Sequence, residues 1–173
     1  MKQITEQEAL LRLSALCAQG EHCQWEMLEK MRQWQVDDEA QARIMQRLVK
    51  DRYVDDERFA RAFVKDKIRY NKWGRRKVEQ ALWQKHIDDD LRRQVLDEVD
   101  SEEYLSVLCP LLQQKQKELE RTTRSQSSAL TSRSSLITQK LIRFALGRGF
   151  TYDLIRQCLD VADDDFPADA DED

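Results

Sequence analysis

The sequence is poor in glycine and proline, with four Gly and two Pro in 173 residues. Sheet proteins need these residues at their many turns, whereas helices tolerate few of either. No apolar run approaches the roughly 18 residues that can cross a bilayer, and charged residues interrupt the N-terminal segment. These shortages argue against a sheet protein, a membrane span and a signal peptide. We expect a helical, cytoplasmic protein.

The residues from which metal and catalytic sites are built are also scarce or poorly spaced. Two histidines are scattered, and no Cys-x-x-Cys pair occurs among Cys17, Cys23, Cys109 and Cys158. We expect four free thiols in a reducing cytosol. No glycine-rich phosphate loop, nucleophile elbow or His-Glu-x-x-His pattern is present. The sequence therefore predicts no enzyme, no metal and no cofactor.

What the sequence has in abundance is charge, and its sign changes along the chain. Charged residues make up 36%, mean hydropathy is −0.77 and the net charge is −4. Between Arg58 and Lys85, however, the only acidic residues are Asp66 and Glu79. Such a composition is typical of amphipathic helices with solvated outer faces, and here it includes a strongly basic middle.

The apolar pattern repeats along the chain. The shift that aligns Val36 with Ile87 also aligns Met31 with Leu82. A second, longer shift aligns Ile87 with Phe150 and Leu82 with Ala145, which gives a third copy. In each copy the apolar residue precedes a helix-capping Asp or Thr. We therefore predict an all-α fold of three tandem three-helix repeats, each resembling a helix-turn-helix unit, in an elongated, curved molecule.

The predicted repeats cover residues 1–52, 53–100 and 101–162. The expected helices are about 5–19, 24–34, 38–51, 55–70, 74–85, 88–99 and 101–121, followed by those of the third repeat. A Ser/Thr-rich loop is expected at about 122–135, within the third repeat. The acidic tail, 163–173, has too few apolar residues to fold and should be disordered.

A stripe of cations marks the first helix of the second repeat. Helical spacing places five cations within about an 80° sector of its surface: Arg58, Arg61, Lys65, Arg69 and Lys72. The opposite, packing face is expected to hold Phe59, Phe63, Lys67 and Tyr70. Acidic residues at i,i+4 spacing are not expected to pair with this stripe. With flanking residues and two tryptophans, the candidate binding face comprises Arg58, Arg61, Lys65, Arg69, Lys72, Trp73, Arg75, Arg76, Lys77, Trp83 and Lys85. The acidic residues at 55–57 and 88–90 are expected to cap helices.

Two segments of the second repeat resemble a known family. Residues 53–60, Tyr-Val-Asp-Asp-Glu-Arg-Phe-Ala, are similar to the Y-L-D-D-E-R-F-A signature of the RecX family. Residues 74–87 resemble its G-P-R-R-I-x-x-E-L-x-x-K-G-I segment at the same distance downstream. Arg52 and His86 stand where the family often has Gly, Arg75 where it often has Pro, and Ala81 where it often has Glu.

The resemblance implies a regulator of the RecA recombinase. Such proteins lie in the groove of the RecA–DNA filament and suppress its ATPase, strand exchange and SOS signalling. The expected partner is thus the RecA filament. The chain itself is expected to be a monomer and to bind single- or double-stranded DNA only weakly. Two alternatives stay open: a helix-turn-helix DNA-binding protein that acts without RecA, and a helical scaffold with another acidic partner.

Overall fold

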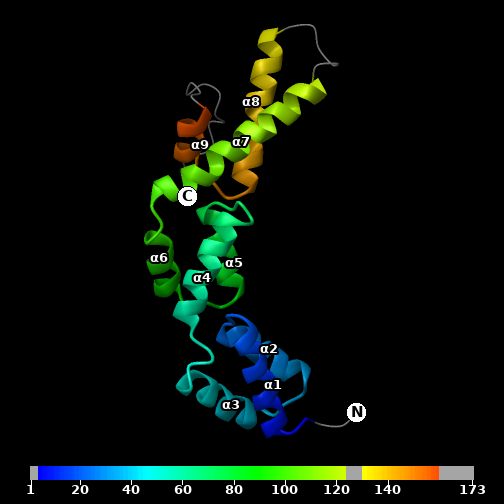
Figure 1. Cartoon of the computed structure of the whole chain (residues 1–173), viewed down its shortest axis with the longest axis vertical. Helices are drawn as coiled ribbons and strands as arrows, with labels where there is room; N and C mark the ends of the chain where they lie inside the picture. The colour runs from blue at the N-terminus through cyan, green and yellow to red at the C-terminus, as the bar shows by residue number, and fades with distance from the viewer. Residues whose placement is uncertain (1–3, 124–129, 160–173) are drawn as a thin grey trace. The chain divides into compact units, whose positions relative to one another are not determined.

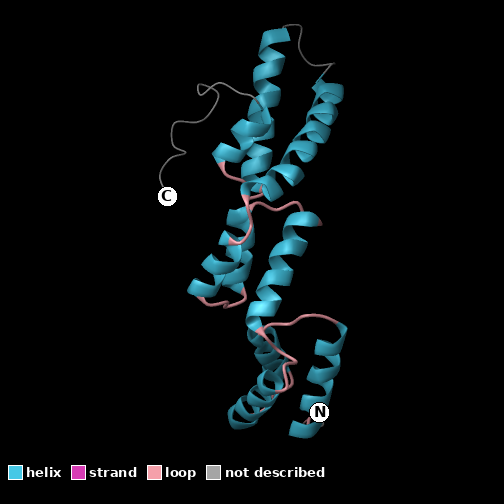
Figure 2. Ribbon diagram, turned by 60° about the vertical axis from the view of Figure 1, so that its left-hand side comes forward, coloured by secondary structure: helices cyan, strands magenta, loops and turns pink. Residues whose placement is uncertain are grey.

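The computed structural model describes residues 4–123 and 130–159, and every regular element among them is a helix (Figures 1 and 2). The helices run in three successive groups of three. The first is α1 (Glu6–Gln19), α2 (Gln24–Gln33) and α3 (Asp38–Lys50); the second is α4 (Asp56–Arg69), α5 (Arg75–Gln84) and α6 (Asp89–Asp97); the third is α7 (Ser101–Thr123), α8 (Leu130–Gly147) and α9 (Tyr152–Leu159). The all-α prediction and the expected helices are confirmed.

Local sequence explains where these helices begin. At α1, the Thr5 hydroxyl accepts from the Glu8 amide at 3.2 Å, while the Glu8 carboxylate accepts from the Thr5 amide, as the capping box predicted. At α3, the Asp37 carboxylate accepts from the Ala40 amide at 3.0 Å. These bonds satisfy amides that have no partner inside the helix.

The same turn precedes the last helix of each group. Its central residue has a positive φ: 57° at Gln35, 55° at His86 and 87° at Gly149. The following apolar amide donates to a carbonyl near the end of the helix before it, from Val36 to Met31, Ile87 to Leu82 and Phe150 to Ala145. The predicted repeat aligns these same donors and acceptors, so it is present in the backbone as well as in the apolar pattern.

Two left-handed positions explain the glycines of the resembled family. His86 has a φ of 55°, and Arg52, after α3, has a φ of 59°. A side chain with a Cβ atom costs roughly 1–2 kcal/mol in this conformation, whereas glycine adopts it freely. This chain therefore carries backbone strain at both positions where it departs from the family's glycine.

The chain divides into two compact units, and the division cuts the middle group of helices. Unit 1 is Met1–Lys65 with Ala81–Val95, and unit 2 is Asp66–Gln80 with Leu96–Asp173. In unit 1, α3 packs on α1 and α2 around a core of Ala9, Leu13, Met27, Met31, Val36, Ala40, Ile44, Leu48 and Val54. In unit 2, α7 packs on α8 and α9 around Leu108, Leu112, Leu141, Ala145, Phe150 and Ile155. The repeat boundaries of the sequence analysis stay a prediction.

Within unit 1, the start of α2 packs on the turn after α5. The Cys23 thiol lies 3.9 Å from the Lys85 carbonyl oxygen, and the Trp25 ring stacks on His86 with centroids 5.6 Å apart. We call this contact the first junction. Side chains make it, since the thiol and the indole both reach the turn from the start of α2.

Within unit 2, the equivalent contact, the second junction, is made by the backbone. The Gly74 amide donates to the Arg148 carbonyl at 2.7 Å, and the Arg76 amide donates to the Gly149 carbonyl at 3.1 Å. In the repeat, Gly74 aligns with Cys23, and Arg148 aligns with Lys85. A Cβ atom on Gly74 would lie 2.3 Å from the Phe150 nitrogen, so only glycine allows this approach.

Of two expectations for the C-terminal part of the chain, the Ser/Thr-rich loop is corrected and the disordered tail is not tested. Helix α8 begins at Leu130 and α7 extends to Thr123, so the loop expected at about 122–135 is helical over much of that range. Ser and Thr composition misled here, because weak helix propensity does not prevent a helix that packs further along its length, as α8 does at Leu141, Ile142 and Ala145. The acidic tail, 163–173, lies outside the described residues.

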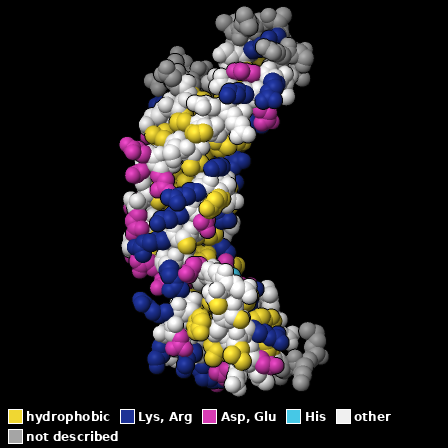
Figure 3. Space-filling model, viewed as in Figure 1, with side chains coloured by type: hydrophobic (Ala, Val, Ile, Leu, Met, Phe, Trp, Pro, Cys, Tyr) yellow, Lys and Arg dark blue, Asp and Glu magenta, His cyan; other side chains and the backbone are white. Residues whose placement is uncertain are grey.

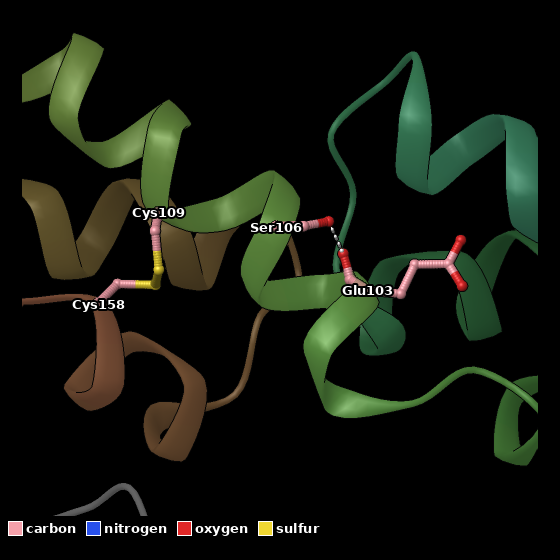
Figure 4. The surroundings of a disulfide bond; sticks show 4 residues. All are labelled: Glu103, Ser106, Cys109 and Cys158. Atoms are coloured by element: carbon pink, nitrogen blue, oxygen red, sulfur yellow. Dashed lines mark hydrogen bonds between the residues drawn. A yellow bond between two sulfur atoms is a disulfide. The ribbon is translucent and has the colours of Figure 1, made fainter.

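The cysteine expectation is half wrong. Cys109 on α7 and Cys158 on α9 form a disulfide, while Cys17 and Cys23 are free thiols (Figure 4). The bond cross-links two helices of unit 2 that pack on each other. Their 49-residue separation carries no sequence signal for pairing, since only the tertiary contact brings the two Cα atoms to 5.1 Å.

Among the described helices, none combines the length and the apolar character that a membrane span needs.

Replacing Arg52 with glycine should stabilise the protein, because glycine relieves the left-handed strain. We expect the free energy of unfolding to rise by about 0.5–1 kcal/mol in urea titrations. Gln46, exposed within α3, provides the control: Gln46→Gly should lower it by about 1 kcal/mol. Equal destabilisation by both substitutions would contradict the strain.

Adding one methyl group at Gly74 should disrupt the second junction. Gly74→Ala must displace backbone atoms at 2.3–2.4 Å. We therefore expect a loss of about 2–3 kcal/mol in the free energy of unfolding. Gly147, with no atom within 4 Å of the added carbon, is the matched control. Gly147→Ala should leave stability unchanged or slightly higher, and a neutral Gly74→Ala would refute the close contact.

Candidate anion-binding cluster

The α4 cations that lie in unit 1 are engaged with acidic residues. The Arg58 Nε atom lies 2.7 Å from Glu21, and Arg61 pairs with Glu57 one turn earlier on the same helix. The expectation of a stripe without i,i+4 acidic partners was therefore wrong. Lys65 is exposed and forms no ion pair with the part of the chain that the structure describes.

The packing face of α4 also differs in part from the prediction. Phe59 is buried and lies 5.5 Å from the partly buried Phe63 ring, as expected. Tyr70, expected on the same face, is 79% exposed. It follows the last residue of α4, where the helical spacing used to place it no longer applies.

Lys85 serves the first junction. Its ammonium nitrogen lies 2.5 Å from the Glu26 carboxylate, which also accepts from His22 at 2.7 Å. Burial raises the pKa of Glu26, but the hydrogen bonds from Lys85 and His22 outweigh it and hold that pKa below its ordinary value. Since its charge is used internally, Lys85 is a structural residue of unit 1.

Two further candidate cations, both in unit 2, have acidic neighbours. Arg75 lies 2.5 Å from Asp97 and also donates to the Leu96 carbonyl at 3.0 Å. Arg69 lies 3.6 Å from Glu103. Part of the basic charge expected from the sequence is thus neutralised by the fold.

Two lysines of unit 2 lie over the Trp73 ring, and further cations lie in the turn and the helix start beside it. The Lys67 and Lys77 nitrogens lie 5.0 and 4.8 Å from the centre of its ring, within the range of cation–π attraction. Lys72, at a φ of 57°, precedes Trp73 in the turn before α5. We call this set the Trp73 cluster; its members are Lys67, Lys72, Trp73, Arg76, Lys77 and Arg148.

The sequence analysis missed two members: Lys67, which it placed on the packing face of α4, and Arg148. The Arg148 guanidinium donates to the Asn71 carbonyl at 2.8 Å and lies 5.0 Å from the centre of the Phe144 ring. It is far from Lys72 in the sequence, and the second junction brings the two together. The only available signal was its alignment with Lys85 in the repeat.

The position of the cluster increases its positive potential. Helix α5 begins with Arg75, Arg76 and Lys77 and has no acidic residue in its first turn. Helix starts carry partial positive charge and usually attract Asp or Glu, so cations there favour an external anion. Arg76 is exposed and has no ion pair among the described residues. On the face drawn in Figure 3, Lys and Arg side chains (blue) lie next to Asp and Glu side chains (magenta) over the middle of the chain.

The other tryptophan predicted for this face has different surroundings. Trp83 belongs to unit 1, is 62% exposed, and shares a pocket with Asp88, Asp89 and Arg92. No group of three or more potential metal ligands occurs among the described residues. The Trp73 cluster, with five basic residues in or beside the turns before α5 and after α8, is thus the candidate anion-binding part of this face.

Comparisons with known proteins agree with the fold and the motif. Residues 55–96 match the family model described as RecX, second three-helix domain. The chain is 31% identical over 120 residues to a regulatory protein RecX of Clostridium botulinum (strain Alaska E43), covering 69% of this chain and 52% of that protein. It is 27% identical over 128 residues to one of Clostridium perfringens (strain SM101), covering 74% and 56% respectively.

The chain spans about half the length of these curated relatives. Its fold matches the crystal structure of RecX from Lactobacillus salivarius with a TM-score of 0.74 at 15% identity, covering 90% of this chain and 94% of that one. The helical fold and the matched middle group are therefore shared features. The middle group is thus a RecX-type three-helix domain, and the chain is similar to regulatory proteins RecX over 69% of its length.

Proposed function

We propose that this chain binds in the groove of the RecA–DNA filament and inhibits the recombinase, lowering ATPase activity, strand exchange and SOS signalling. The observation that carries the proposal is the Trp73 cluster, in which two lysines flank one indole just before the basic start of α5. A filament groove that contains DNA presents phosphates and acidic side chains. The matched RecX domain and the similarity to regulatory proteins RecX support RecA as the partner.

The charge balance favours a composite partner over naked DNA. The chain carries a net charge of −4, and several of its basic side chains are paired internally. Each phosphate contact contributes a salt-dependent share of the affinity, so a small cluster supports only weak DNA binding. We therefore assign tight binding to the filament and weak binding to free single- or double-stranded DNA.

The proposal assigns no chemical step to the chain itself. A monomer that occupies the groove would act by contact alone, with the Trp73 cluster and Lys65 facing the filament. Five other candidate cations make intramolecular pairs, so we give them a smaller part in the contact: Arg58, Arg61, Arg69, Arg75 and Lys85.

Reversing two charges of the cluster tests the proposal. Arg76→Glu/Lys77→Glu should weaken inhibition of the RecA ATPase on single-stranded DNA by about tenfold, as the loss of roughly 1.4 kcal/mol implies. Acidic residues suit the first turn of a helix, so the double variant should keep α5 folded. Half-inhibitory concentrations would be measured across a titration of each protein.

A matched reversal on other exposed lysines controls for total charge. Lys50→Glu/Lys117→Glu changes the net charge by the same amount, and neither residue belongs to the cluster. Its inhibition should stay within about twofold of the unmodified chain. Unchanged inhibition by a folded Arg76→Glu/Lys77→Glu variant would contradict the assignment. Tight, sequence-selective duplex binding without RecA would instead favour a DNA-binding protein.

A further inference from the structure

A second aromatic site lies at the turn between α5 and α6, in unit 1. Trp83 is 62% exposed, and it lines a pocket of about 500 Å³ together with His86, Asp88, Asp89 and Arg92. Every lining residue falls between positions 83 and 92. The pocket is therefore formed by the end of α5, the turn that follows it and the first turn of α6.

The pocket has one uncompensated negative charge. Arg92 donates to the Ile87 carbonyl at 2.6 Å and pairs with Asp89, and its side chain is only 14% exposed. Asp88 accepts from the amides of Asp90 and Leu91 at 3.1 and 3.4 Å, and forms no ion pair among the described residues. Asp88 thus places an unpaired carboxylate charge beside an exposed indole.

The equivalent turn of the first group shows what differs. There Gln41 donates to the Val36 carbonyl at 2.7 Å, as Arg92 does to Ile87. The pocket beside that turn is smaller, about 270 Å³, and the start of the chain lines part of it with Ile4, Thr5 and Glu6. Within the described ranges, no distant segment lines the pocket of the second group.

The aromatic–acidic pairing is also confined to the second group. At the positions equivalent to Trp83 and Asp88, the first group has Arg32 and Asp37, and the third has Leu146 and Thr151. A tryptophan 62% exposed is not needed to hold the turn, since the other two groups form the same turn without it. The pairing therefore points to a ligand.

We propose that this pocket binds one arginine side chain presented by a protein partner. A planar guanidinium stacks on the face of an indole, and its N–H groups donate to a carboxylate such as that of Asp88. One guanidinium matches the single uncompensated charge. A nucleic acid would bring phosphates towards Asp88 and Asp89, which opposes its binding here. The inference does not depend on the proposed RecA function, because its test uses the chain alone.

Titration of the whole chain with N-acetyl-L-arginine amide, followed by NMR of the tryptophan indole N–H groups, tests the pocket. The Trp83 signal, identified by its loss in Trp83→Leu, should shift saturably, and the Trp73 signal should not. The uncharged citrulline analogue should bind about fivefold more weakly. Equal shifts with both compounds, or none with either, would overturn the proposal.

Two isosteric substitutions separate the pocket charge from the general charge. Asp88→Asn keeps a helix-capping side chain and should weaken arginine binding about threefold to fivefold. Asp90→Asn makes the same charge change at a residue that does not line the pocket, and should change binding less than about twofold. Equal effects of the two variants would refute a specific site. A saturable Trp83 shift with oligothymidylate, in place of arginine, would identify a nucleic-acid site instead.

Discussion

The structure depends on one turn, used three times, in which a left-handed residue is followed by a buried apolar residue and a helix cap. The turn joins the last two helices of each group and places Val36, Ile87 and Phe150 in the core. Two of the three turns then receive the start of a preceding helix, at Cys23 in unit 1 and at Gly74 in unit 2. Since the two contacts stand at equivalent positions, a single local geometry organises both units.

The two contacts are built with different chemistry, and the difference matters for function. At the first junction, side chains meet and use Lys85, Glu26 and the Trp25–His86 stack internally. At the second, backbone meets backbone because Gly74 has no Cβ atom, and the surrounding cations gather at the surface around Trp73. Because Gly74 has no side chain, the second junction is not filled by an interlocking side chain of the kind that makes the first junction.

Two aromatic sites of opposite electrostatic character result. Trp73 lies among ammonium groups, whereas Trp83 lies beside carboxylates. The acidic net charge is consistent with this arrangement, because it limits binding to any polyanion that offers phosphate alone.

The sequence by itself determined the helices, their caps and the repeat, because these depend on near neighbours along the chain. Apolar spacing found Met31, Leu82 and their equivalents, and the matched motif found the middle group. Tertiary structure decided most of which cations are paired, since the acidic partners of Arg58, Arg69 and Arg75 belong to other helices or loops, whereas the Arg61–Glu57 pair is local. It also decided that Arg148 joins Lys72 and that Cys109 pairs with Cys158, contacts between residues too distant for any local pattern to predict. Periodicity reports which face of a helix is apolar; which residue of another helix meets that face depends on how the chain folds back on itself.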